Sequence, residues 1–457
     1  MVLSDPFVHS LAANRCVFPS RDSFALMETI MDATPIRKCR VCGNDDLVKV
    51  LDLGSQAATG IFPKSAEEKV FIGPLELIKC VDDPSRDTCG LVQLGHRYDP
   101  SLLFGDHYGY RSGLNSSMVA HLRGKAERVK KRIGLKSGDV ILDIGSNDGT
   151  FLAALLHPGV TGVGMDPSAE KFRKYYRSEL QIIPELFSAA GFRRHFGAQK
   201  LKLITSIAMF YDLDEPFTFM QEIASLLADD GMWVFEQSYL PAMVEQTSYD
   251  TVCHEHQEYY ALKQIVWMAD RAGLAVIDVE LNNINGGSFS VIAAPKTSAH
   301  ATSANEVQQL LGNEQHNGFG SLGLYEDFRE RVLRHREELL QSLQARLKQG
   351  KVILGYGAST KGNVILQFCG LTPKELPAIA EVNSDKFGYQ TPGTHIPIIS
   401  EQEAHALRPN AFLVLPWHFR QNLLEREASF LASGGEMIFP LPRIEAVGRA
   451  ESHSHRM

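Results

Sequence analysis

VILDIGSNDGTFL, residues 140–152, has the pattern of a buried strand, a glycine turn and the start of a helix. Further apolar stretches of strand length lie at Gly162–Met165, Leu201–Ser206 and Gly231–Phe235, and helical patterns separate them. This alternation predicts a doubly wound parallel sheet, in which ligands bind outside the carboxyl ends of the strands.

The glycine turn differs from that of dinucleotide sites. Its spacing after Asp143 is Gly-x-x-x-Gly, whereas G-x-G-x-x-G brings two glycines against a pyrophosphate. An acidic strand end favours an ammonium group, and Asp166, after the next strand, is placed to accept both hydroxyls of a ribose. We therefore expect S-adenosylmethionine as cofactor, against the alternative of a plain α/β turn. The candidate cofactor-binding residues are Asp143, Gly145, Ser146, Asn147, Gly149, Asp166, Pro167, Ser206, Met209 and Phe210.

Composition restricts the class of protein. A chain of 457 residues is expected to form two or three packed units, and no apolar run approaches the roughly 20 residues needed to cross a bilayer. The net charge of -8 argues against nucleic acid as a partner, so the basic stretch 125–132 is expected to be a solvated helix face. The first thirty residues lack the apolar core of a signal peptide. We expect a cytoplasmic protein without a membrane partner, either a monomer or a weak homo-oligomer.

Four of the seven cysteines lie between residues 39 and 89, which suggests a metal in a reducing compartment. Cys39 and Cys42 form a C-x2-C knuckle, and Cys80 and Cys89 follow with a wider spacing. Four thiolates would complete one structural, tetrahedral Zn²⁺ site that leaves no open position for chemistry. The alternative is a set of buried free thiols.

The expected fold class is α/β, with a small zinc-binding module followed by two Rossmann-like domains. A long charged helix is expected at about Leu324–Gln349, and strands of the last domain at Val352–Leu354, Ala378–Val382 and Phe412–Leu415. The predicted divisions are an extension outside the fold (1–35), the zinc-binding module (36–100), the cofactor domain (101–300), a linker and long helix (301–350), the C-terminal domain (351–448) and a disordered tail (449–457).

Two imidazoles and a carboxylate stand together at His254-Glu255-His256. His-x-His can bind metal, but no third and fourth ligands are evident nearby, so proton transfer is favoured because histidine titrates near neutrality. A polar surface loop is the other alternative.

Together these features resemble the sugar C-methyltransferases of deoxysugar biosynthesis, and the resemblance runs from Cys39 to Val447. The motifs that carry it are Cys39-x-x-Cys42-Gly43, Tyr110–Gly113, Asp143–Gly149, Ser206–Tyr211, His254–His256, Asn285–Ser288 and Gly355–Asn363. The resemblance implies a C-terminal domain that helps hold a nucleotide sugar, a catalytic pair at Glu255 and His256, and His256 as the base. The chain departs from the family at Cys253, where a Tyr is usual, and at Met209, where a His is usual.

The implied reaction methylates the carbon α to the keto group of a nucleotide-diphosphate-linked 4-keto-deoxysugar. A base removes the α proton to give an enolate, and Tyr110 or Tyr108 is the expected donor to the enolate oxygen. His254 completes the set of candidate catalytic residues. The candidate acceptor-binding residues are Tyr110, Ser112, Asn115, Glu236, Tyr239, Cys253, Asn285, Tyr356, Ser359, Lys361, Asn363, Glu381, Asn383, Lys386, His395 and Trp417.

Four alternatives stay open at this point. The acceptor could be a non-sugar carbonyl compound or a hydroxyl group, and the chain could be a binding module without turnover. The loop from Gly355 to Asn363 also permits NAD, which would make the C-terminal domain that of an oxidoreductase.

Overall fold

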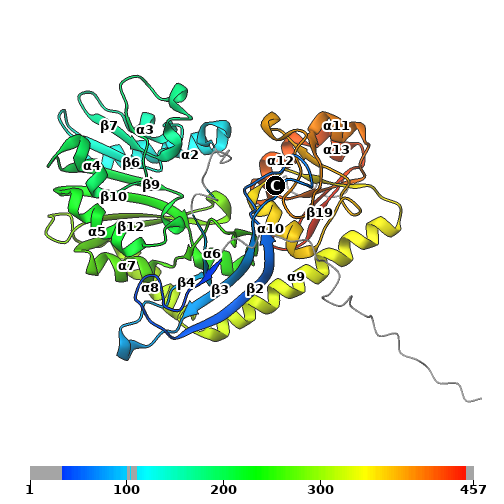
Figure 1. The fold of residues 1–457 in the computed structure, drawn as a ribbon, viewed down its shortest axis with the longest axis horizontal. Helices are drawn as coiled ribbons and strands as arrows, with labels where there is room; N and C mark the ends of the chain where they lie inside the picture. The colour runs from blue at the N-terminus through cyan, green and yellow to red at the C-terminus, as the bar shows by residue number, and fades with distance from the viewer. Residues whose placement is uncertain (1–32, 100–102, 104–110, 449–457) are drawn as a thin grey trace, which may run out of the picture.

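The computed structural model describes residues 33–99, 103 and 111–448. The expected tail 449–457 and nearly all of the expected extension lie outside these residues. The described chain forms three bodies: a blue N-terminal sheet lies below and between a cyan-green α/β body and an orange-red one (Figure 1).

The first α/β body contains a seven-stranded sheet in the order β12-β13-β10-β9-β6-β7-β8. All neighbours are parallel except β13, which pairs antiparallel with both β10 and β12. Strand order reverses between β6 and β9, which is the switch point where ligands bind in such sheets. The strands are β6 (Val140–Ile144), β7 (Thr161–Met165), β8 (Gln181–Ile183), β9 (Leu201–Ile207), β10 (Leu227–Ser238), β12 (Leu274–Asn282) and β13 (Ser288–Pro295).

Alternate residues of these strands face two helical layers. Ile141 and Leu203 pack with helices α2 and α3, whereas Leu142 and Ile204 pack with α4, α5 and α7. The helices of this body are α2 (Ser116–Ile133), α3 (Thr150–Leu155), α4 (Ala189–Phe196), α5 (Pro216–Leu226), α6 (Leu240–Glu245), α7 (Leu262–Arg271) and α8 (Asn305–His316).

The N-terminal module contributes two sheets. The larger has the order β11-β4-β3-β2, and its edge strand β11 comes from the far-off segment Glu258–Tyr259. The smaller pairs β1 with β5. The other strands are β1 (Thr34–Pro35), β2 (Leu47–Ala57), β3 (Ile72–Cys80), β4 (Val92–Leu94) and β5 (His96–Arg97).

The C-terminal body has a six-stranded sheet in the order β16-β15-β14-β17-β18-β19, parallel except for the last pair. In chain order this is 3-2-1-4-5-6, the doubly wound order whose switch point lies between β14 and β17. Its elements are β14 (Ile353–Tyr356), α10 (Thr360–Cys369), β15 (Ile379–Glu381), β16 (Ile398–Ser400), α11 (Glu401–Ala406), β17 (Ala411–Val414), α12 (Arg420–Arg426), α13 (Ala428–Ala432), β18 (Glu436–Phe439) and β19 (Glu445–Val447).

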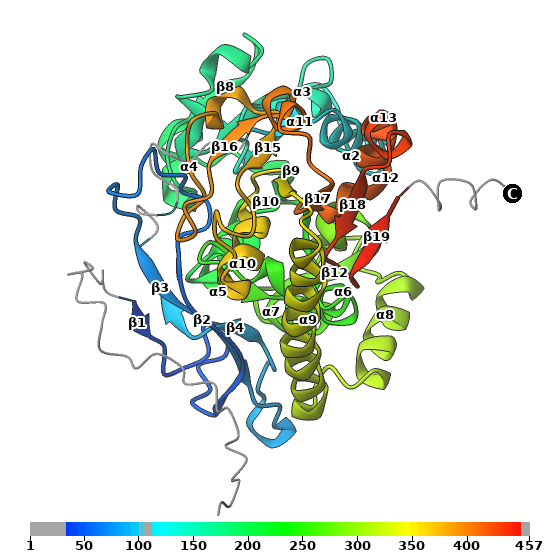
Figure 2. The same cartoon turned by 90° about the vertical axis from the view of Figure 1, so that its right-hand side faces the viewer.

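One hydrophobic core joins the N-terminal module to the C-terminal body. Helix α9 (Leu322–Lys348) runs beneath both and buries Phe328, Val332 and Leu339 in that core. Both α9 and α10 contact β2 (Figures 1 and 2). The module therefore shares its core with the C-terminal body instead of building its own.

The α/β class with several sheets is confirmed. The expectation of a solvated helix face at residues 125–132 was wrong in part, because Lys125 is buried and forms an ion pair with Glu236 of β10. Within the described residues, no helix is both long enough and apolar enough to span a bilayer.

Candidate functional site

The four clustered cysteines meet at one point. Their sulfur atoms all lie within 4.8 Å of one another, with Cys39 to Cys89 at 3.5 Å and Cys42 to Cys80 at 3.6 Å. With Zn–S bonds of about 2.3 Å, the sulfurs of a tetrahedral site stand roughly 3.8 Å apart, so the thiol set fits zinc. The Nδ2 atom of Asn44 is 3.4 Å from the Cys80 sulfur, in the position of a group that orients a ligand.

The wide spacing between Cys80 and Cys89 is taken up by a local loop. Asp83 caps a short 3-10 helix, Pro84–Arg86, and its backbone N–H donates to the Thr88 hydroxyl at 2.7 Å. This closed loop carries the intervening residues outward and returns the chain to Cys89. Although Cys80 and Cys89 are farther apart in the sequence than the residues of a C-x2-C knuckle, their sulfur atoms therefore lie in the same cluster.

The cofactor turn lies at the carboxyl end of β6. Gly145 and Gly149 have φ of +69° and +74°, which favours glycine. A Cβ on Gly145 would stand 3.1 Å from the Met209 side chain, and one on Gly149 would stand 2.8 Å from the Tyr176 ring. The two glycines thus let the side chains of Met209 and Tyr176 pack closely against the backbone of the turn.

Two carboxylates flank this turn, as expected. Asp143 is 2% exposed and accepts a 2.6 Å hydrogen bond from the Thr205 hydroxyl, and burial together with the charge of Asp166 raises its pKa to about 7. Asp166 accepts hydrogen bonds from the backbone N–H groups of Asn147 and Ser168 at 2.8 and 2.6 Å. Pro167 follows at the start of a 3-10 helix.

The segment before α2 is fastened to the cofactor turn. The backbone N–H of Ser112 donates to the Asn147 side chain at 3.0 Å, and that of Gly113 donates to Asp148 at 2.9 Å. Asn115 caps α2 by accepting from the N–H of Ser117. Tyr108 and Tyr110 immediately precede this segment and lie outside the described residues.

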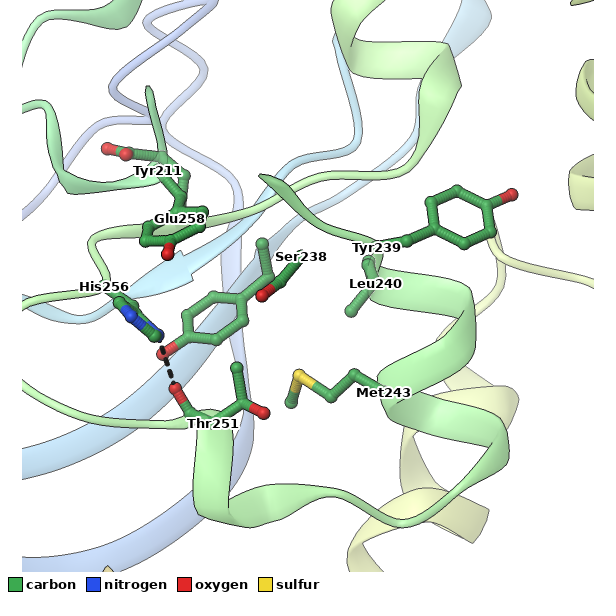
Figure 3. Close-up of a pocket in the computed structure, with 9 residues that line it drawn as sticks. Tyr211, Ser238, Tyr239, Leu240, Met243, Thr251, His256 and Glu258 are labelled. Atoms are coloured by element: carbon green, nitrogen blue, oxygen red, sulfur yellow. Dashed lines mark hydrogen bonds between the residues drawn. The ribbon is translucent and has the colours of Figure 1, made fainter. Parts of the chain in front are cut away.

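His256 lines a cavity of about 10 Å³ together with Tyr211, Ser238 and Glu258 (Figure 3). Its Nδ1 atom lies 2.8 Å from the carbonyl oxygen of Thr251, so Nδ1–H donates there and Nε2 is the basic atom. Burial, with the positive charge of Lys361, lowers the pKa of His256 to about 4. The imidazole is therefore neutral at pH 7, the form that a general base needs.

Lys361 brings a cation from the C-terminal body to this region. It donates a 2.6 Å hydrogen bond to the carbonyl oxygen of Asn285. Burial lowers the pKa of Lys361, and Asp250 and Cys253 offset only part of this shift. Asp250 is fully buried and accepts from Trp417 Nε1 at 2.8 Å, so the two bodies are joined on either side of Lys361.

Glu255 and His254 point away from this cavity into the module. Glu255 lies against Thr59 and Gly60, and His254 is fully buried between the rings of Phe71 and Tyr98. The partner that fixes the His256 ring is thus Thr251 and not Glu255.

A larger cleft of about 300 Å³ separates α2, the β12–β13 turn and the residues around α12. On its wall, His121 Nε2 lies 2.6 Å from Glu236, which also accepts from Lys125 and Asn282 at 2.9 Å each. Burial would raise the pKa of Glu236, but His121 and Lys125 lower it to about 2. The cleft is lined by Ser117, Met118, His121, Asn282, Asn283, Ile284, Asn285, His418, Phe419, Gln421 and Asn422.

The loop after β14 reaches the switch point of the C-terminal sheet. Ser359 caps α10, and Lys386 donates to the carbonyl oxygen of Ala358 at 2.6 Å. Glu381 accepts from the backbone N–H groups of Ala358, Val382 and Asn383.

Several predicted site residues make internal contacts. Ser206 accepts from Trp233 Nε1, Phe210 packs among core rings, Tyr239 donates to Glu314, and the Tyr356 hydroxyl lies within hydrogen-bond distance of both Glu401 and Glu427. Cys253 is fully buried and lies close in sequence to Glu255 and His256. Asn383 caps a 3-10 helix. His395 is exposed on a turn.

Sequence reasoning missed His121, Lys125, Thr59 and Tyr176. None stands in a recognisable local motif, because each acts through a partner far away in the chain. Only the helical spacing of His121 and Lys125, four residues apart, hinted that both face one partner.

Three family models match successive parts of the chain: "Putative zinc binding domain" at 39–104, "Methyltransferase domain" at 118–279 and "C-methyltransferase C-terminal domain" at 283–442. C-methyltransferase NovU of Streptomyces niveus is 31% identical over 428 residues, 92% of this chain and 98% of that protein. Two solved structures match the fold more weakly. An S-adenosylmethionine-dependent methyltransferase from Clostridium acetobutylicum has 13% identity, 39% and 92% coverage of the two chains and a TM-score of 0.32. The CcbJ methyltransferase from Streptomyces caelestis has 15% identity, 38% and 94% coverage and a TM-score of 0.30.

The methyltransferase match covers the segment that carries the cofactor turn, so the chain is an S-adenosylmethionine-dependent methyltransferase. The relation to NovU extends through the N-terminal module and the C-terminal body as well. The chain therefore belongs to the family of C-methyltransferases.

Proposed function

We propose that this enzyme methylates the carbon α to the keto group of a nucleotide-linked 4-keto-deoxysugar through an enolate. The observation that carries the proposal is the neutral imidazole of His256, which Thr251 orients and on which the positive charge of Lys361 acts. Carbon methylation needs a base to create the nucleophile. His256 supplies the base, and Lys361 supplies a positive charge that stabilises the developing anion.

His256 performs the first step. The α C–H bond breaks, its proton moves to Nε2, and the electron pair passes into the enolate, whose oxygen becomes the anion. Thr251 holds the ring throughout because its carbonyl oxygen accepts from Nδ1–H in both the neutral and the protonated form. The positive charge of Lys361 stabilises the negative charge of the enolate. When no enolate is present, the carboxylate of Asp250 stabilises the Lys361 cation.

The turn at Gly145–Gly149 and the carboxylates of Asp143 and Asp166 would hold S-adenosylmethionine. When bound, this cofactor supplies an electrophilic methyl group on a sulfonium. Asp166 sits at the end of β7, where each carboxylate oxygen already accepts one N–H and retains a second lone pair for a ribose hydroxyl. Met209 covers the turn where the family has a histidine.

The acceptor would span the two α/β bodies. The start of α10, with Ser359 and the nearby cation of Lys386, suits a diphosphate, because a helix start and a cation favour an anion. The 300 Å³ cleft has no Lys, Arg, Asp or Glu among its described lining residues, so it suits an uncharged polar group such as a sugar ring. The thiol cluster would hold one structural Zn²⁺.

The test is mass spectrometry of the enzyme with S-adenosylmethionine and thymidine- and uridine-diphosphate-linked 4-keto-6-deoxyhexoses. We expect a methylated sugar and S-adenosylhomocysteine in equal amounts. With S-adenosylhomocysteine replacing the methyl donor, the α proton should exchange with D2O. Methylation without any such exchange, on a sugar hydroxyl, would favour the O-methyltransferase alternative instead.

A further inference from the structure

The loop that carries the catalytic pair, residues 253–259, is held along its length by the N-terminal module. His254 donates to the carbonyl oxygen of Gly73 at 3.1 Å, and its ring centroid lies 4.9 Å from each of Phe71 and Tyr98. The end of the loop then becomes β11 and pairs with β4. The loop is thus an added strand of the module's sheet.

Arg40 lies beside the first cysteine of the knuckle and reaches the same loop. Its guanidinium, with no exposed surface, donates to Gln257 Oε1 at 3.0 Å and to the Leu94 carbonyl oxygen at 2.7 Å. It also lies 3.7 Å from the Glu258 carboxylate. The metal knuckle and the catalytic loop therefore share one buried cation.

The Glu255 carboxylate lies against Thr59 and Gly60, the segment that follows β2. The Thr59 hydroxyl lies 3.5 Å from Glu255 Oε2. A Cβ on Gly60 would stand only 2.5 Å from Glu255 Oε1, so an alanine there would force the carboxylate to move from this position. Burial raises the pKa of Glu255, and the nearby Thr59 and Gly60 act in the opposite direction.

Helix α10 of the C-terminal body forms hydrogen bonds with the same segment, at Ala57 and Thr59. Asn363, fully buried, donates to the Thr59 carbonyl oxygen at 2.7 Å. Gln367 makes a pair of hydrogen bonds with the backbone of Ala57, at 2.7 and 3.1 Å. Helix α10 therefore fixes the segment against which the Glu255 carboxylate lies.

We propose that the N-terminal module completes the active site, with Thr59, Gly60 and Asn363 acting as positioning residues for Glu255. This inference rests on the proposed function and adds one premise to it, that Glu255, the residue next to the base, takes part in turnover. A module that served only as a metal-stabilised support would not need the Glu255 carboxylate to lie against Thr59 and Gly60, nor hydrogen bonds to that segment from the opposite body.

The experiment compares Gly60→Ala, Thr59→Val and Thr59→Ser in the full-length enzyme. Gly60→Ala should lower kcat by about 10²-fold, the loss expected for a displacement near 1 Å. Thr59→Val should lower kcat roughly tenfold and Thr59→Ser should restore it, because only the serine keeps the hydroxyl. Affinity for S-adenosylmethionine should not change. Gly312→Ala is the control, since a Cβ there meets nothing within 4 Å.

Two further readouts separate positioning from general damage. In a Glu255→Gln background, Thr59→Val should cause no additional loss, whereas equal losses in both backgrounds would overturn the inference. Hydrogen–deuterium exchange of the peptide covering 253–259 should rise in Gly60→Ala without an acceptor present. Unchanged exchange in this peptide would overturn the inference, whether or not the enzyme methylates a sugar. Failure of the wild-type enzyme on the sugar panel would count against the proposed function alone.

Discussion

The Nδ1 atom of His256 lies 2.8 Å from the carbonyl oxygen of Thr251, which leaves Nε2 as the atom that can accept a proton. Replacing His256 by Asn should therefore lower kcat by roughly 10²- to 10⁴-fold, the usual contribution of a general base. Calorimetry should show unchanged affinity for S-adenosylmethionine, and exchange of the acceptor's α proton in D2O should stop. Normal exchange in this variant would remove His256 from the mechanism.

The pH dependence of turnover should report the charge of Lys361. Burial and Lys361 lower the pKa of His256 to about 4, so the base stays neutral and kcat/KM should show no loss from this group between pH 6 and 8. Lys361→Met removes the positive charge, so the pKa should rise and an acid limb should move upward toward neutrality. An unshifted limb would show that Lys361 does not act on the base.

Cofactor affinity should depend on pH through Asp143. Its pKa is raised by burial to about 7, and only the ionised carboxylate attracts the cofactor's ammonium. The Kd for S-adenosylmethionine should thus fall as pH rises from 6 to 8, and Asp143→Asn should flatten the curve. 5'-Methylthioadenosine lacks the ammonium and is the matched ligand control. The same slope with that ligand would contradict the assignment.

Metal content tests the thiol cluster. Purified enzyme should carry about one Zn²⁺ per chain, and Cys89→Ser should lose it and lower the melting temperature because the metal stabilises the folded module. Cys369, a buried thiol on α10, supplies the control Cys369→Ser, which should keep its zinc. Full zinc occupancy in Cys89→Ser would exclude Cys89 as a ligand.

Local patterns predicted the elements of this protein well. The apolar run at Val140–Ile144 is a buried strand in the structure, and the glycines after it have the positive φ that the turn demands. These features depend on neighbours in the sequence, so their signals are local. The same holds for the C-x2-C knuckle.

Side-chain partners were the part that sequence could not supply. That Glu236 binds the acceptor stays a prediction, but its contacts with Lys125, 111 residues away, and with His121 were not foreseen. Tyr356 was expected in the loop after a strand, but it is the last residue of β14 and its hydroxyl donates to Glu427. Such pairings are set by which helices cover which face of a sheet, and no local pattern encodes that.

The pairing of His121 with Glu236 leads to a last prediction about the cleft. Because Nε2 faces the carboxylate, Nδ1 is the ring nitrogen left to form a hydrogen bond with a hydroxyl of an acceptor in the cleft. His121→Asn should raise the acceptor KM about tenfold, the value of one hydrogen bond in free energy, and leave the Kd for S-adenosylmethionine unchanged. His195→Gln, at an exposed histidine on α4, is the control. If His121→Asn lowered kcat with no change in KM, the cleft would not hold the acceptor in its ground state, and the sugar ring would have to be placed elsewhere between the two bodies.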